Sequence, residues 1–159
     1  MIIISDSSPL ISLVIIGQLE LLEKLYDEFF VPSAVFEEVI RADKPFAEDL
    51  EAFLDGRIKH VKNKMAVEML SENIGAGEAE AIVFALEQQP AIILIDDLKA
   101  RKFAKLKGLN IIGTMGILLK AKHERLIKEI KPLIAELLMN DIRISRKIVD
   151  ITLQAASEV

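Results

Sequence analysis

The sequence of 159 residues contains no cysteine, no tryptophan and a single tyrosine, Tyr26. The absence of cysteine excludes disulfides, thiolate metal ligands and a cysteine nucleophile. The scarcity of large aromatic rings leaves little surface on which nucleic-acid bases could stack. No apolar run approaches the roughly 20 residues that a membrane-spanning helix needs, and Met1–Asp6 lacks the basic stretch that opens a signal peptide. We therefore expect a cytoplasmic protein without a membrane segment.

What the chain does have is typical of one packed domain. Hydrophobic residues make up 52% of the sequence, and no repeat, linker or low-complexity segment divides it, so we expect a single domain over 1–159. The formal net charge is −5, a mild acidic bias, whereas a strongly acidic balance would argue against a generic nucleic-acid binder. The basic residues are unevenly placed, however, and gather in 57–64, 98–107 and 120–128. Binding to nucleic acid is therefore not excluded by charge.

Short apolar segments alternate with longer periodic ones along the chain. The apolar runs predict five strands, at 2–5, 29–31, 58–61, 91–95 and 110–112. The periodic segments predict helices at 8–16, 18–26, 32–42, 44–56, 65–73, 78–89 and 97–108, and then C-terminal helices at about 115–123, 124–139 and 144–157. Ser8 and Ser33 are expected to cap two of these helices.

This alternation predicts an α/β fold. The two clearest strands, 2–5 and 91–95, are apolar throughout, as in parallel sheets that are covered on both faces. We therefore expect a three-layer α/β/α domain with a central parallel sheet of about five strands. In such folds a functional site forms in the crevice beyond the carboxyl ends of the strands.

Acidic residues occur where that crevice is predicted. Asp6 ends the first strand, and Asp96 and Asp97 end the strand 91–95. Two more acidic pairs, Glu37 with Glu38 and Glu78 with Glu80, lie in helices that can reach the same edge. Each acid alone could serve as a helix cap or turn former. Together, like charges in a crevice repel one another, and a Mg²⁺ or Mn²⁺ ion, which prefers oxygen ligands, would relieve the repulsion.

Helical geometry selects among some of these acids. Glu38 shares a helix row with alanines and is the less solvated of its pair, so we choose Glu38 over Glu37. Asp97 fits a helix N-cap, which leaves Asp96 to point into the crevice. Glu78 and Glu80 both lie in a first helical turn, and this reasoning leaves the choice between them open.

The order of four motifs resembles the PIN-domain family, in particular its prokaryotic branch related to VapC-type toxins. The motifs are "ISDSSPLI", "VPSAVFEEV", "GEAEAIVFALE" and "LIDDLKARKFAKLKGLNIIGTMGIL". The resemblance implies a metal-dependent ribonuclease with the catalytic acids Asp6, Glu38, Glu80 and Asp96. The implied cofactor is one or two Mg²⁺ or Mn²⁺ ions, with Glu78 and Asp97 as further candidate ligands. Many PIN nucleases have aspartate at the third acidic position, where this chain has glutamate.

The substrate implied by the resemblance is RNA. The helix after Asp97 carries Lys99, Arg101 and Lys102 beside the predicted metal site, and these residues are candidate phosphate contacts. Ser7 and Thr114 are further candidate substrate contacts. For Thr114 the resemblance supplies the reason, because the family often has a small polar residue there, and a helix cap is an equal alternative.

The resemblance also implies partners and a second function. VapC-type proteins are usually neutralised by a small antitoxin and tend to form homodimers, so we expect a toxin of a toxin–antitoxin pair that is a homodimer or a higher homo-oligomer. The alternative is a catalytically weak or inactive module that binds RNA or an antitoxin-like protein.

A phosphoacceptor receiver domain fits the sequence poorly. The segment 58–61 lacks the acceptor aspartate, and Asp6 is a single acid where such a domain needs a pair.

Overall fold

The computed structural model describes residues 1–41 and 43–159. Its sheet has five parallel strands in the order β3-β2-β1-β4-β5. The strands are β1 (Ile2–Ser5), β2 (Glu28–Pro32), β3 (Ile58–Lys59), β4 (Ala91–Leu94) and β5 (Asn110–Ile112). The predicted parallel sheet is therefore confirmed.

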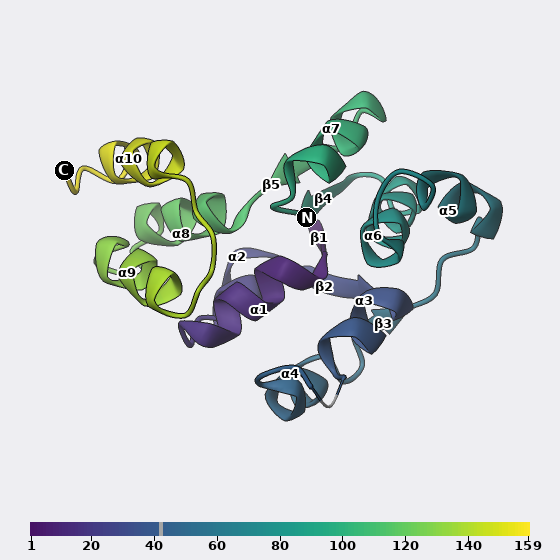
Figure 1. Cartoon of the computed structure of the whole chain (residues 1–159), viewed down its shortest axis with the longest axis horizontal. Helices are drawn as coiled ribbons and strands as arrows, with labels where there is room; N and C mark the ends of the chain where they lie inside the picture. Colours follow the sequence, from purple (N-terminus) through teal and green to yellow (C-terminus); the bar gives the residue numbers. More distant parts are fainter. Residues whose placement is uncertain (42) are drawn as a thin grey trace.

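Helices cover both faces of the sheet, so the fold has the predicted three α/β/α layers. The helices are α1 (Ser7–Ile15), α2 (Glu20–Leu25), α3 (Ser33–Val39), α4 (Ala47–Phe53), α5 (Lys64–Leu70), α6 (Ala76–Glu87), α7 (Leu98–Leu106), α8 (Thr114–His123), α9 (Lys131–Met139) and α10 (Arg146–Ala155). In Figure 1, α8, α9 and α10 gather on the left of the sheet, and α5 and α6 lie on the right.

The alternation of side chains along each strand builds two hydrophobic cores. On one face, Ile3 and Leu94 pack in a cluster with apolar residues of α1, α2, α8 and α9. On the other face, Ile4 and Ile93 pack in a cluster with residues of α6 and α7. All four side chains are fully buried. Burial on both faces explains why these strands are apolar runs rather than alternating ones.

The strand order places a topological switch point between β1 and β4. From β1 the chain proceeds outward through β2 and β3, then returns to form β4 on the other side of β1. In the parallel register Ser5 pairs with Leu94, so both strands end at the same level. Asp6 follows β1 directly and its N–H donates to the carbonyl of Leu94, at 3.0 Å. A switch point of this kind is where α/β sheets bind ligands.

Two predicted helix caps are wrong. Helix α1 begins at Ser7 with Asp6 as N-cap, so Ser8 lies inside the helix. Proline in the first turn is compatible with this start, because N–H groups there have no intrahelical partner. The N-cap of α3 is Pro32, and Ser33 is its first helical residue. Residue 42, the predicted end of that helix, lies outside the described residues.

The C-terminal region departs from the predicted segment 124–139. Helix α8 ends at His123, and Arg125 has a left-handed backbone with φ of 63°, which a continuing helix does not allow. Helix α9 starts only at Lys131, with Pro132 in its first turn. A proline deeper in a helix would remove a hydrogen bond and clash with the preceding turn, which explains the late start.

Over the described residues, every helix is too short or too polar to cross a bilayer.

Candidate active site

A cavity of about 600 Å³ opens at the carboxyl end of β1. It lies between the start of α1, the helix α3 and the first turn of α6. The residues that line it are Asp6, Ser7, Ser8, Ala34, Glu37, Glu38, Arg41, Gly75, Ala76, Gly77 and Glu78. We call it the acidic pocket, because four of these side chains are carboxylates and one is basic.

Asp6 is the deepest carboxylate of the acidic pocket. Its residue is 3% exposed. Burial raises the pKa of Asp6 from 3.8 to about 7, and the Ser7 N–H, which would stabilise the charged form, opposes this rise only in part. The negative charges of Glu78, Glu38 and Asp96 raise the pKa of Asp6 further. The four acids therefore interact electrostatically around the end of β1, although they are far apart in the sequence.

Glu38 enters the pocket from α3. Its Oε2 accepts a hydrogen bond of 2.9 Å from the Ser7 hydroxyl. Glu38 is half-buried and Glu37 is exposed, so the predicted difference in solvation within this pair is confirmed. Ser7, the predicted substrate contact, lines the acidic pocket, and its hydroxyl holds the Glu38 carboxylate.

Glu78, in the first turn of α6, is the third acid of the acidic pocket after Asp6 and Glu38. Its Oε1 accepts the Gly75 N–H at 3.0 Å, which ties the side chain to the start of its own helix. Partial burial raises the pKa of Glu78, and the charges of Asp97 and Glu38 raise it further, against the Gly75 hydrogen bond. Glu78 is thus part of the same cluster of like charges.

Glu80 points elsewhere. Its Oε1 accepts the backbone N–H of Ala34 at 3.0 Å and the Ser33 hydroxyl at 3.4 Å. Both donors lie in the first turn of α3, so Glu80 satisfies one of the free N–H groups of that helix start, that of Ala34. Glu80 does not line the acidic pocket. Reasoning from the residues left the choice between Glu78 and Glu80 open, and the family resemblance implied Glu80. The structure differs from that implication, because Glu78 is on the helix face toward Asp6 and Glu80 is not.

Asp96 and Asp97 divide their roles at the end of β4. Asp97 is exposed and is the N-cap of α7, where its Oδ2 accepts the Ala100 N–H at 3.0 Å. Asp96 Oδ1 accepts the Thr114 N–H at 2.7 Å, and its Oδ2 accepts the hydroxyl of the same residue. The side chain of Thr114, buried at the start of α8, therefore positions Asp96.

The basic candidates are placed differently from one another. Lys99 and Lys102 are exposed on the surface of α7 and do not line the acidic pocket. Arg101 is half-buried, and its Nη1 donates to the carbonyl of Ile95 at 2.8 Å. This bond fixes the guanidinium at the edge of the sheet beside Asp96.

The donor chemistry of the site fits a hard divalent cation. Every ionisable candidate ligand is a carboxylate. Burial first, and then the like charges of its neighbours, raise the pKa of Asp6, and a dication would favour the charged form against both effects. Glu38, Glu78 and Asp96 each have an oxygen engaged by a hydroxyl or a backbone N–H. In 1–41 and 43–159, no three histidine, aspartate or glutamate side chains are close enough to coordinate one ion as they stand.

Comparison with known families decides the identity of the fold. A family model for DUF3368, a PIN domain, matches residues 2–158. The chain belongs to the PIN-domain family. PIN domains are generally nucleases that use divalent metal ions, so membership supports a hydrolase kind of activity. Searches of curated proteins and of solved structures give no match.

Sequence reasoning did not single out Gly77, which lines the acidic pocket of this PIN-domain protein. A Cβ atom at Gly77 would lie 3.0 Å from Glu38 Oε2 and 3.7 Å from Asp6 Oδ1. Glycine thus lets the backbone of α6 approach both carboxylates. The signal was available in the sequence, because glycine within a first helical turn next to acids is unfavourable for the helix and calls for a packing reason.

Gly77→Ala is expected to reduce catalysis without unfolding the protein. Alanine favours a helix by about 1 kcal/mol over glycine, but the new methyl group would displace the Glu38 carboxylate by a few tenths of an ångström. We expect metal-dependent nuclease activity to fall about tenfold or more, with a melting temperature within a few degrees of wild type. Full activity in a folded variant would contradict the close approach at Gly77.

Proposed function

We propose that this PIN-domain protein is a Mg²⁺- or Mn²⁺-dependent endoribonuclease that hydrolyses RNA phosphodiester bonds. The observation that carries the proposal is the convergence on buried Asp6 of carboxylates from α3, from α6 and from the segment that follows β4. Asp6, Glu38, Glu78 and Asp96 are the proposed catalytic and metal-holding groups. Glu80 and Asp97 are assigned instead to helix capping, on the basis of their hydrogen bonds.

A bound divalent ion would lower the pKa of an attacking water and stabilise the charge on the departing oxygen. The residues of the chain supply orientation. Ser7 holds Glu38, Gly75 holds Glu78 and Thr114 holds Asp96, each through a hydrogen bond to a carboxylate oxygen. Such bonds to ligand groups fix their direction, and their loss typically costs ten- to a hundredfold in metal affinity or activity.

The test of this proposal is cleavage of a labelled, structured RNA by purified protein. Cleavage is expected with Mg²⁺ or Mn²⁺ and should stop on addition of EDTA. A DNA of the same sequence should not be cut, and it should compete only weakly with the RNA. Absence of metal-dependent cleavage of a broad pool of cellular RNAs would argue against the nuclease proposal.

A second candidate function is a catalytically weak module that binds RNA or a protein. It is favoured by one observation: in the described part of the chain, the carboxylates do not form a ready coordination sphere. The two candidates differ in their metal dependence. A nuclease binds Mn²⁺ and loses cleavage when Asp6 is changed, whereas a binding module holds its partner equally well in EDTA.

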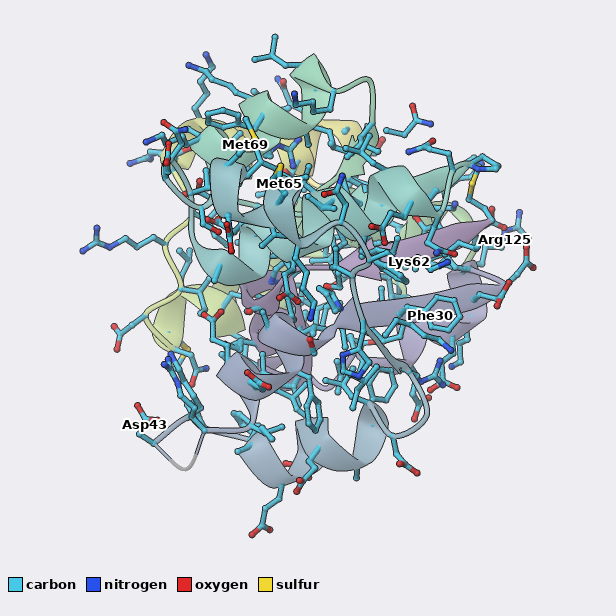
Figure 2. The ribbon with its side chains drawn as sticks, turned by 90° about the vertical axis from the view of Figure 1, so that its right-hand side faces the viewer. Phe30, Asp43, Lys62, Met65, Met69 and Arg125 are labelled. Carbon is cyan, nitrogen blue, oxygen red and sulfur yellow. The ribbon has the colours of Figure 1, made fainter. Side chains whose placement is uncertain are left out.

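We also propose that the protein is the toxin of a toxin–antitoxin pair and that it self-associates. The proposal is supported by the family membership and by apolar side chains left on the surface. On α5, Met65 and Met69 are 72% and 66% exposed, and Figure 2 shows them one turn apart on the same helix. Growth arrest on expression that disappears in Asp6→Asn would support the toxin role, and sedimentation would report self-association.

A further inference from the structure

A second concavity lies beside the acidic pocket and begins at Asp96. It has a volume of about 590 Å³ and runs between β5, the start of α8 and the segment that leads into α10. We call it the groove. Its walls include Ile112, Ile144 and Ile148, and its charged lining residues are Asp96, Arg101 and Arg143. The groove therefore joins an apolar wall to two cations and to one of the catalytic candidates.

Both arginines of the groove are available to an anion. Within the described residues, neither Arg101 nor Arg143 has a carboxylate oxygen within 4.0 Å. Arg101 is anchored by its bond to the carbonyl of Ile95, and a guanidinium has further donors after making one such bond. Arg143 is exposed in the segment before α10.

A third arginine lies on the other side of the catalytic candidates. Arg41 is the one basic residue among those that line the acidic pocket. Its nearest carboxylate is that of Asp43, at 4.0 Å, and both side chains are more than half exposed. A pair of this kind contributes little, so Arg41 is free to engage another anion. In the strand order, Arg41 belongs to the β2 side and Arg143 to the β5 side of the β1–β4 switch point.

The positions of Arg41, Arg101 and Arg143 bear on how an acidic site can bind RNA. A cluster of carboxylates repels the phosphates of RNA, and binding needs cations that contact the backbone. Arginine suits this task because its planar guanidinium binds phosphate through two parallel hydrogen bonds. Cations on both sides of the carboxylates can hold a strand across them, with the phosphate to be cleaved in the middle.

We propose that a single RNA strand crosses the carboxyl edge of the sheet from a phosphate site at Arg41 to a second phosphate site at Arg143 in the groove. The proposal rests on the proposed nuclease function, whose site it extends. The isoleucines of the groove wall contact bases without reading hydrogen-bond patterns. Single-stranded RNA is favoured over a protein segment as occupant because the groove is continuous with the carboxylates and its unpaired charges are cationic.

The test is RNA binding by Arg41→Ala and Arg143→Ala, each combined with Asp6→Asn to prevent cleavage. Arg146→Ala in the same background is the matched control, since Arg146 is an exposed arginine three residues away that lines neither the acidic pocket nor the groove. The probe is a fluorescent single-stranded RNA, in which any site of cleavage by the wild-type protein is mapped first. It is measured at several salt concentrations and after trimming from its 5′ or its 3′ end.

Each test variant is expected to bind about five- to tenfold more weakly than the control. The slope of log affinity against log salt concentration should fall by about 0.7 per lost phosphate contact. One arginine variant should become insensitive to trimming of the 5′ side, and the other to trimming of the 3′ side. This opposite response would place the two sites on opposite sides of the cleaved bond.

The inference is overturned if Arg41→Ala and Arg143→Ala bind the RNA as tightly as Arg146→Ala does. A protein segment would then be the better candidate for the occupant of the groove. Failure of the nuclease proposal is a separate outcome. Protein with intact Asp6 that never cleaves RNA with Mn²⁺ contradicts the proposed function, and the arginine-dependent binding would then describe an RNA-binding surface without turnover.

Discussion

Replacing Asp6 with asparagine is expected to abolish RNA cleavage and, at the same time, to stabilise the metal-free protein. Asparagine keeps the size of the side chain but removes the charge that a dication would neutralise. If the carboxylate contributes several kcal/mol to transition-state stabilisation through the metal, cleavage should fall about a thousandfold or more. The rate of cleavage of a labelled RNA with Mn²⁺ measures this loss.

The gain in stability follows from the raised pKa of Asp6. The carboxyl of Asp6 has a pKa of about 7 in the folded protein and 3.8 in the unfolded protein. As pH rises, it therefore loses its proton in the unfolded state before it does so in the folded state. The free energy of unfolding of the wild type should therefore decrease as pH rises from about 4 to about 7, by up to about 4 kcal/mol. Asp6→Asn removes this decrease and should be the more stable protein at pH 8.

Urea denaturation in EDTA at pH 5 and pH 8 checks this expectation. Asp55→Asn is the matched control, because it removes one exposed negative charge at the end of α4, outside the acidic pocket. If the free energy of unfolding depends on pH in the same way in Asp6→Asn and Asp55→Asn, the carboxylate of Asp6 is not buried as described above. A destabilised, inactive Asp6→Asn would mean that Asp6 acts as a structural turn former.

The second large effect separates two glutamates of the same helical turn. Glu78→Gln is expected to reduce cleavage by about a hundredfold or more, because Glu78 faces Asp6 and a neutral amide is a poor ligand for a hard cation. Its capping bond to Gly75 can persist, so the fold should be retained. Cleavage rate and melting temperature are the measurements.

Glu80→Gln is the internal control for this prediction. Glu80 caps the start of α3, so the loss of its charge should cost about 0.3–1 kcal/mol of stability and leave cleavage within about threefold of wild type. The opposite pattern, with activity lost in Glu80→Gln and kept in Glu78→Gln, would restore the assignment that the family resemblance implied.

Much of this architecture could be predicted from the sequence. The runs 2–5 and 91–95 predicted central parallel strands because both of their faces are buried, and Asp6 and Asp96 were placed at one edge by topology alone. The less solvated member of the pair Glu37 and Glu38 followed from the alanines on its helix row. In each case the decisive interaction is local or is fixed by the periodicity of the element.

Other features depend on how elements pack, and local patterns do not contain that information. Whether Glu78 or Glu80 faces Asp6 is set by the rotation of α6 against α3. Ser33 has the chemistry of a helix cap, but its hydroxyl donates to Glu80, which lies 47 residues away. Arg41 and Arg143 became candidate phosphate contacts only once the pocket and the groove were known.

The central claim is that the acids that follow β1 and β4 act together with acids of α3 and α6 as one site for a divalent ion. Its most direct test is Mn²⁺ binding by wild type, Asp6→Asn, Glu78→Gln and Glu80→Gln, measured by the loss of the free Mn²⁺ signal in electron paramagnetic resonance at pH 8. We expect one or two bound ions in wild type and Glu80→Gln, and strongly weakened binding in the other two. Equal Mn²⁺ binding by all four proteins, or none by wild type, would contradict the claim.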